Sequence, residues 1–143
     1  MTFNSLQTIV SLCKEQDINF AEAVRKIEKQ ASGLSWQAQY QRMNSLWKAM
    51  QEASKTYDPD IRSASGLSGG DGEKFRLYAN KKNTLCGTFV SAVVTAALRM
   101  AESNACMKRI VAAPTAGSCG VLPSVLIPMY EGKQADEKEI LEA

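Results

Sequence analysis

The segment from Thr84 to Ser103, TLCGTFVSAVVTAALRMAES, constrains the fold more than any other stretch of the chain. It is almost purely small and apolar, and its length favours a helix, although the β-branched residues in VSAVVT leave some room for a strand. A helix that is apolar on all sides and rich in Ala, Ser, Thr and Gly is buried, with its neighbours close to its backbone. We therefore expect this helix to be the most buried element, with Cys86 packed inside it.

Helical periodicity also marks the N-terminal third of the chain. Apolar residues recur at spacings of three and four from Leu6 to Cys13 and again from Phe20 to Ile27, which makes one apolar face in each segment and places Cys13 in the core. Asn19 with Glu22 is typical of a capping box, and Gly33 ends that helix. A third helix, capped by Ser35, carries an apolar stripe that other helices should cover: Trp36, Tyr40, Met43, Trp47 and Met50.

Two stretches interrupt the helical pattern. The first, DPDIRSASGLSGGDG from Asp58 to Gly72, holds glycines and serines but no apolar residues at helical spacing, which predicts a loop. The second runs from Met107 to Gly117, and a further helix begins at about Ser118 to Gly120, with Pro123 in its first turn. The sequence thus predicts an all-α, irregular helical domain of about six helices with two long glycine-rich loops.

Composition and charge exclude several functions. Hydrophobic residues make up 45% and charged residues 22% of the 143 residues, which is typical of one globular domain. The net charge of +2 and the lack of basic runs give no reason to expect a nucleic-acid partner. No segment has the length of a membrane span and no secretory signal is recognisable, so we expect a cytoplasmic protein that does not enter a membrane.

The chain contains no histidine, which removes Ser-His-Asp and Cys-His catalytic pairs and the usual zinc ligands. The glycine-rich stretch SGLSGGDGEK fits neither phosphate-binding glycine motif. The cysteines are far apart, without disulfide or CxxC spacing, which suits a reducing compartment: Cys13, Cys86, Cys106 and Cys119.

Cys119 lies in the stretch APTAGSCG, at the start of a predicted helix and next to Gly120. A helix N-terminus favours the thiolate form of a cysteine, which is both a nucleophile and a metal ligand. Glycines beside it allow a large group to approach the backbone. Spacing alone leaves three interpretations open: a packed cysteine, a metal or cluster ligand, and a redox thiol.

Two motifs carry a resemblance to a known family. The segments MKRIVAAPTAGSCGVLPSVL, from Met107 to Leu126, and RSASGLSGGD, from Arg62 to Asp71, resemble the α chain of bacterial iron–sulfur-dependent L-serine dehydratase, also called L-serine ammonia-lyase. The similarity runs along essentially the whole chain but covers only about the front half of the family's α chain. The resemblance therefore identifies residues 1–143 as the N-terminal part of the catalytic α-chain domain, without its C-terminal half.

The resemblance implies a reaction, a cofactor and partners. The family eliminates water from L-serine with a [4Fe-4S] cluster as Lewis acid and gives pyruvate and ammonia. The implied partners are the rest of the α chain or a β chain, and further copies of the same chain in a homo-oligomer. By the same resemblance Cys119 is a cluster ligand whose fellow ligands lie beyond Ala143, whereas Cys86 and Cys106 match no ligand.

Residues of both loops are implied to enclose serine, because backbone N–H groups and hydroxyls suit a carboxylate. The implied substrate-binding residues are Ser63, Ser65, Gly66, Ser68, Gly69, Gly70, Thr115 and Ser118. The alternative for each hydroxyl is a bond to its own backbone. Asp71 is interpreted as a turn residue or helix N-cap, and no base for the α-proton can be named.

Several consequences follow for the isolated chain. We expect it to be inactive and without a cluster, with Cys119 a free thiol near the surface or in a pocket, close to the loop from Arg62 to Asp71. The alternative functions are a thiol-based redox protein that uses Cys119, and a non-catalytic helical interaction module suggested by the stripe of tryptophans and methionines.

Overall fold

The computed structural model describes residues 5–81, 84–109, 111–112, 115 and 118–142. Within these residues the protein has seven helices and no strand, which confirms the all-α prediction and comes close to the expected number of helices. None of the helices in these ranges combines the length and the apolar character that crossing a membrane would require. The chain forms two compact units, one up to Ser45 with the last residues from Leu141, the other from Leu46 to Ile140.

The first unit is built on the helices α1 (Leu6–Gln16) and α2 (Phe20–Ser32). The predicted capping box is present: Glu22 N–H donates to Asn19 Oδ1 at 2.8 Å, and Asn19 N–H donates to the Glu22 carboxylate at 3.2 Å. Gly33 ends α2 in the left-handed conformation, as expected. The core of this unit consists of Ile9, Ala23 and Ile27, against which Leu12, the partly buried Cys13 and Ile18 pack.

The helix α3 (Trp36–Lys55) begins after Ser35, whose hydroxyl accepts the Ala38 N–H at 3.2 Å. Its apolar stripe is covered over only part of its length. Trp47 and Met50 are buried, whereas Trp36 and Met43 are exposed. The expectation that other helices cover the whole stripe was therefore wrong for its first half, where periodicity marks an apolar face but cannot say whether a neighbour covers it.

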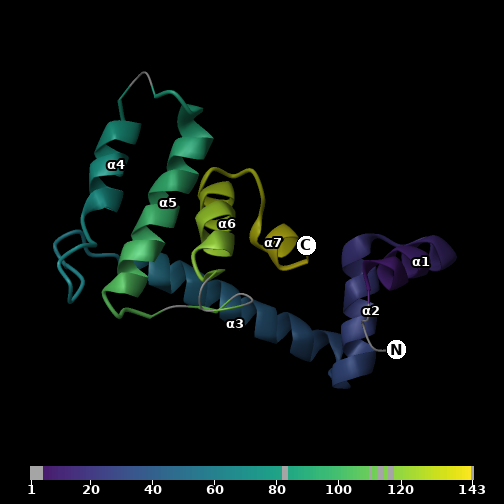
Figure 1. Cartoon of the computed structure of the whole chain (residues 1–143). Helices are drawn as coiled ribbons and strands as arrows, with labels where there is room; N and C mark the ends of the chain where they lie inside the picture. The colour runs from purple at the N-terminus through teal and green to yellow at the C-terminus, as the bar shows by residue number, and fades with distance from the viewer. Residues whose placement is uncertain (1–4, 82–83, 110, 113–114, 116–117, 143) are drawn as a thin grey trace. The chain divides into compact units, whose positions relative to one another are not determined.

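In the second unit α5 (Gly87–Ala105) lies between α4 (Asp71–Ala79) and α6 (Val121–Glu131), as Figure 1 shows. The chain continues into the short helix α7 (Glu137–Glu142). The loop that precedes α4 ends at Gly70, two residues before the expected boundary. Of the second predicted loop, the described residues 107–109, 111–112 and 115 lie outside helices, and the other positions lie outside the described residues.

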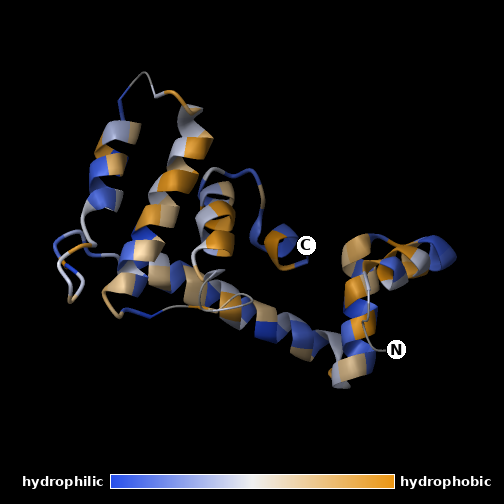
Figure 2. Ribbon diagram, in the orientation of Figure 1, coloured by the Kyte–Doolittle hydropathy of each residue, from blue (hydrophilic) through white to orange (hydrophobic). Residues whose placement is uncertain are grey.

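The prediction that α5 is the most buried element was wrong. Its buried residues are mostly polar or small, and its first turns are open: Val90 is 47% exposed, and Cys86, expected to pack, is exposed. Figure 2 shows hydrophobic residues along both α5 and α6. The buried residues of α5 include Ser91, Thr95 and Met100. The uniform apolarity of the sequence therefore did not reveal which face of the helix would be covered.

Candidate functional site

The first loop is closed by bonds between its own residues. Ser63 N–H donates to the Ser68 carbonyl at 2.9 Å, and Ser68 N–H donates to Ser63 Oγ at 3.1 Å. The hydroxyls of Ser63 and Ser65 lie 3.1 Å apart, and Gly66 N–H donates to the Ser63 carbonyl at 2.8 Å. The hydroxyls of Ser63 and Ser65 thus accept backbone N–H groups of the loop, which is the alternative role expected for them.

Glycine is required at two positions of this loop. Gly69 has φ +134° and Gly70 has φ +81°, conformations that other residues rarely adopt. A Cβ on Gly69 would collide with the Ile61 carbonyl oxygen, and one on Gly70 would lie 2.8 Å from an Arg62 Nη atom. The end of the loop thus packs tightly against Ile61 and Arg62, directly before α4 begins.

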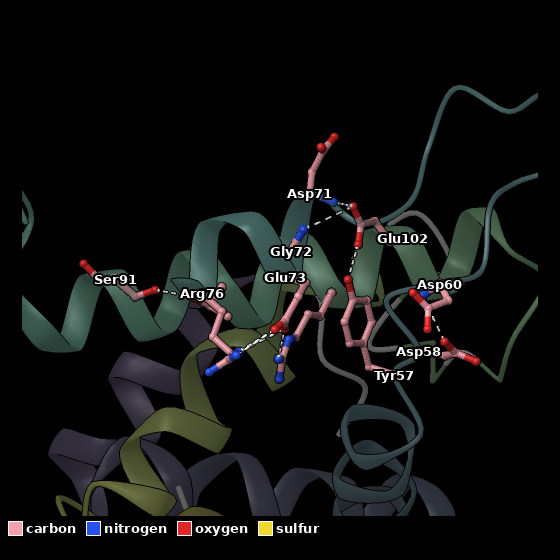
Figure 3. Close-up of polar contacts among 11 residues, drawn as sticks. Tyr57, Asp58, Asp60, Asp71, Gly72, Glu73, Arg76, Ser91 and Glu102 are labelled. Carbon is pink, nitrogen blue, oxygen red and sulfur yellow. Dashed lines mark hydrogen bonds and ion pairs between the residues drawn. The ribbon is translucent and has the colours of Figure 1, made fainter. Parts of the chain in front are cut away.

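Glu102 anchors this loop to α5, and sequence reasoning missed it. The side chain is only 5% exposed. Its carboxylate accepts the N–H groups of Asp71 at 2.5 Å and Gly72 at 3.2 Å and the Tyr57 hydroxyl at 2.6 Å (Figure 3). A carboxylate at a helix N-terminus satisfies unpaired N–H groups and opposes the positive end of the helix dipole. Glu102 therefore caps α4 from another helix.

Tyr57 is held by this arrangement. Burial, together with the hydrogen bond to the Glu102 carboxylate and its charge, raises the pKa of Tyr57 to about 12. The Arg99 guanidinium lies over the Tyr57 ring, 4.8 Å from its centroid. The phenol is consequently kept protonated and fixed between two charged side chains of α5.

Glu73 of α4 binds two arginines, Arg76 in the same helix and Arg99 in α5. Arg76 donates through Nε and Nη2, and Arg99 Nη2 lies 3.0 Å from Glu73 Oε2. The hydrogen bond from Arg76 holds the pKa of Glu73 at about 2, well below its ordinary value. The carboxylate is therefore ionised at neutral pH and holds both guanidinium groups in place.

The second segment leads into α6. Thr115 Oγ1 and Ser118 Oγ lie 3.1 Å apart, and Thr115 N–H donates to Ser118 Oγ at 3.3 Å. Gly120 occupies the N-cap position of α6, which confirms the predicted start of this helix, and Pro123 lies buried in its first turn. Thr115 and Ser118 thus shape a turn before α6.

Cys119 was expected to be a free thiol near the surface or in a pocket. Cys119 is free but only 7% exposed. It lines a cavity of about 10 Å³, the space of a single water molecule at most. Apart from Arg109 the lining is apolar: Met50, Ala53, Met100, Val111 and Pro123. A position near the surface, one of the two expected for this thiol, was therefore wrong, because the turn before α6 packs against α3 and α5 within the second unit.

These surroundings do not fit a [4Fe-4S] cluster as they stand. Such a cluster is held by several cysteine thiolates, and the cavity beside Cys119 has no room for it. Among the described residues no group of three or more His, Cys, Asp or Glu side chains is placed to hold a metal ion. Cys86 precedes α5 and Cys106 follows it, so these two thiols stand at opposite ends of a 19-residue helix.

The two segments end on the same turn of α5. A Cβ built on Gly72 would lie 3.1 Å from Arg99 N, and one built on Gly120 would lie 3.3 Å from Met100 Cβ. With ordinary backbone dimensions these contacts place the Cα atoms of Gly72 and Gly120 within about 15 Å of each other. The start of α4 and the start of α6 therefore lie near the same turn of α5.

The fold and this site define the class of protein: an all-α chain in which a serine- and glycine-rich loop and a cysteine-bearing turn are held at the C-terminal end of one central helix. A family model described as "Serine dehydratase alpha chain" matches residues 15–143. The chain therefore belongs to the serine dehydratase α-chain family.

Two curated relatives are similar over most of the chain. The "Probable L-serine dehydratase, alpha chain" of Bacillus subtilis (strain 168) is 29% identical over 129 residues, which are 90% of this chain and 43% of the relative. The "L-serine dehydratase, alpha chain" of Peptoniphilus asaccharolyticus is 27% identical over 138 residues, which are 96% of this chain and 47% of the relative. The chain thus spans somewhat less than half the length of these relatives. No solved structure matches significantly.

Proposed function

We propose that this chain is the N-terminal part of the α chain of an L-serine dehydratase, an enzyme that eliminates water from L-serine and gives pyruvate and ammonia. The observation that carries the proposal is the family match over residues 15–143, supported by two relatives named as L-serine dehydratase α chains. Because the chain spans less than half of these relatives, the activity belongs to the complete enzyme, and the isolated chain is expected to be inactive. The remainder of the α chain or a β chain, and further copies in a homo-oligomer, are its proposed partners, in the cytoplasm.

In this proposal the first loop binds the carboxylate of serine. Its backbone N–H groups and the hydroxyls of Ser63, Ser65 and Ser68 are suitable donors, with Gly66, Gly69 and Gly70 allowing close approach of the ligand to the backbone. The internal bonds of Ser63 and Ser68 would have to be exchanged for bonds to the ligand. Glu102 and the glycine turn at Arg62 support this by fixing the end of the loop, and Gly120, two residues after Ser118, lies close to Met100 of the same helix as Glu102.

We further propose that the complete enzyme uses a [4Fe-4S] cluster, which would activate the hydroxide leaving group as a Lewis acid. The ligand role of Cys119 rests on the family motif alone, since its present surroundings are apolar. A paired substitution separates a ligand from a packed thiol: Cys119→Ala should lower the iron bound per complete enzyme, and Cys106→Ala should leave it unchanged. Equal iron content in both variants would refute the ligand role.

The alternative of a thiol-based redox protein receives less support. A redox thiol has to meet its partner, and reactive cysteines are at least partly accessible. Cys119 is nearly fully buried in an apolar setting. Burial therefore disfavours a function in which Cys119 reacts with an external disulfide.

The test is the kinetics of pyruvate formation from L-serine by the complete enzyme, purified without oxygen, with and without Ser68→Ala in this chain. We expect a higher KM for serine in the variant with a smaller change in kcat, because a contact to the unreacted carboxylate contributes to binding before and during the reaction. Ser5→Ala, at the start of α1, is the matched control and should leave both constants unchanged. An enzyme that forms no pyruvate from serine would overturn the proposal.

A further inference from the structure

A second polar site lies along the row of α4, α5 and α6, away from the first loop. It is a cleft of about 250 Å³ whose walls come from these three helices and from Ser54 of α3. The volume is below the range of pockets that hold drug-sized ligands, so it suits a molecule of a few carbon atoms. Neither the family motifs nor the proposed serine-binding loop includes these lining residues.

One end of the cleft is cationic. Arg76 and Arg99 both line it, and their side chains remain 38% and 29% exposed. Both are held by the single Glu73 carboxylate, so two positive charges are opposed there by one negative charge. A guanidinium fixed in this way has donors left over for a further carboxylate, with little loss of side-chain freedom on binding.

The walls of the cleft contain polar atoms that lack partners. Within the part of the chain that the structure describes, Ser91 Oγ and Arg99 Nε are buried without a hydrogen bond. Buried polar atoms normally have hydrogen-bond partners, so two such atoms without partners on the same helix need an explanation. A change of side-chain rotamer would point both groups into the cleft, where a bound acceptor would supply the missing hydrogen bonds.

Apolar side chains also line the cleft. They are Ala92 and Ala96 of α5 and Ile127 of α6. Methyl and methylene groups of a small ligand can pack against them, while its charged end meets the arginines.

We propose that this cleft binds a small monocarboxylate, with its carboxylate on Arg76 and Arg99 and its carbon chain against Ala92 and Ile127. The proposal does not depend on the dehydratase function, because the cleft is made entirely by residues of this chain. Glu131 also lines the cleft, and its negative charge disfavours a second carboxylate on the ligand.

The experiment is a titration of the 143-residue chain, labelled with ¹⁵N, with propionate, L-serine and ethanolamine. Propionate and L-serine share the carboxylate, so both should shift the amide resonances of Asn80, Ala92 and Thr95 and saturate in the millimolar range, about 1–10 mM. Ethanolamine lacks the carboxylate and should leave these resonances unmoved.

A matched pair of variants locates the charge. Arg76→Gln removes a cleft arginine and its i,i+3 ion pair with Glu73, whereas Lys74→Gln removes the same charge and the same kind of pair, with Asp71, outside the cleft. Binding should weaken roughly tenfold in Arg76→Gln and less than about twofold in Lys74→Gln. Circular dichroism checks that both variants are folded.

Any one of these results would overturn the proposal: no saturable shift with either carboxylate, equal shifts with ethanolamine, or equal weakening in the two variants. Shifts confined to residues 62–70 would assign the carboxylate to the loop and would also reject the cleft. The test is separate from that of the dehydratase, since an inactive complete enzyme would leave the cleft binding intact.

Discussion

Removal of the Glu102 carboxylate should destabilise the second unit strongly, because three donors depend on this one buried side chain. The N–H groups of Asp71 and Gly72 and the Tyr57 hydroxyl all donate to it. A buried donor left without a partner costs about 1–3 kcal/mol. The Gly72 contact is buried and the other two are partly buried, so we count about 2 kcal/mol for the first and about 1 kcal/mol for each of the others, which gives about 4 kcal/mol for Glu102→Ala.

Glu102→Gln provides the comparison, because its single amide oxygen can still accept the N–H groups of Asp71 and Gly72. The charge is lost, and the amide nitrogen in place of the second oxygen cannot accept the Tyr57 hydroxyl. We expect about 1–2 kcal/mol for this variant, since a charged acceptor forms hydrogen bonds roughly twice as strong as a neutral one and opposes the helix dipole. Glu137→Ala is the control, because the Glu137 side chain is exposed. It should change the free energy of unfolding by less than about 1 kcal/mol.

The assay is urea unfolding followed by tryptophan fluorescence in a Trp36→Phe background. The chain has two tryptophans, so Trp47, buried in the second unit, becomes the only reporter. A loss below about 1 kcal/mol in Glu102→Ala would refute the capping role, because it would mean that water or other groups replace the carboxylate without cost.

Three further predictions concern the same site. The pKa of Glu73 is lowered from 4.5 to about 2, so the stability that its ionised form contributes is complete above about pH 4.5 and is lost as the pH falls through 2. Glu73→Gln should remove this part of the acid dependence of the urea midpoint, and an unchanged pH profile would contradict the assignment. The pKa of Tyr57 is raised from 10.0 to about 12, so the folded state prefers the protonated phenol and loses stability as the pH rises from about 10 through 12. Tyr57→Phe should flatten the alkaline branch of the same pH profile, and a branch as steep as in the unchanged chain would reject the assignment. Gly69→Ala should lower the free energy of unfolding by at least about 2 kcal/mol, because of strain at positive φ and the collision with the Ile61 carbonyl. Gly66→Ala, where a Cβ meets nothing within 4 Å, should lower it by about 1 kcal/mol. Equal losses in urea unfolding would rule out the close approach at Gly69.

Features that depend on neighbours in the sequence were predicted well. The capping box of Asn19 and Glu22, the end of α2 at Gly33 and the start of α6 after Gly120 all follow from interactions within a few residues, and all are present. The same holds for the all-α class, because helical periodicity is a local property.

Features that depend on which surfaces meet were predicted poorly. The first turns of α5 are apolar and nevertheless exposed. Cys119, expected near the surface or in a pocket, is buried beside a cavity of only about 10 Å³. Neither outcome is encoded by spacing, because burial is decided by helices that lie far away in the chain.

Glu102 shows the same limit and also a signal that could have been used. Its partner Tyr57 is 45 residues away, so no local pattern pairs them. Apart from Arg99, Glu102 is the only charged residue in a small and apolar segment, and an unpaired buried charge is costly. Such a residue predicts a specific polar partner, even though the sequence does not say which.

The most direct test of the dehydratase assignment is to measure pyruvate formed from L-serine, without oxygen, by this chain alone, by the polypeptide that completes the enzyme in its source organism alone, and by the two expressed together. We predict that neither alone forms pyruvate, that the two together do, and that exposure to air abolishes the activity. Pyruvate formation by the completing polypeptide without this chain, or a stable assembly of the two that leaves serine unchanged, would contradict the account.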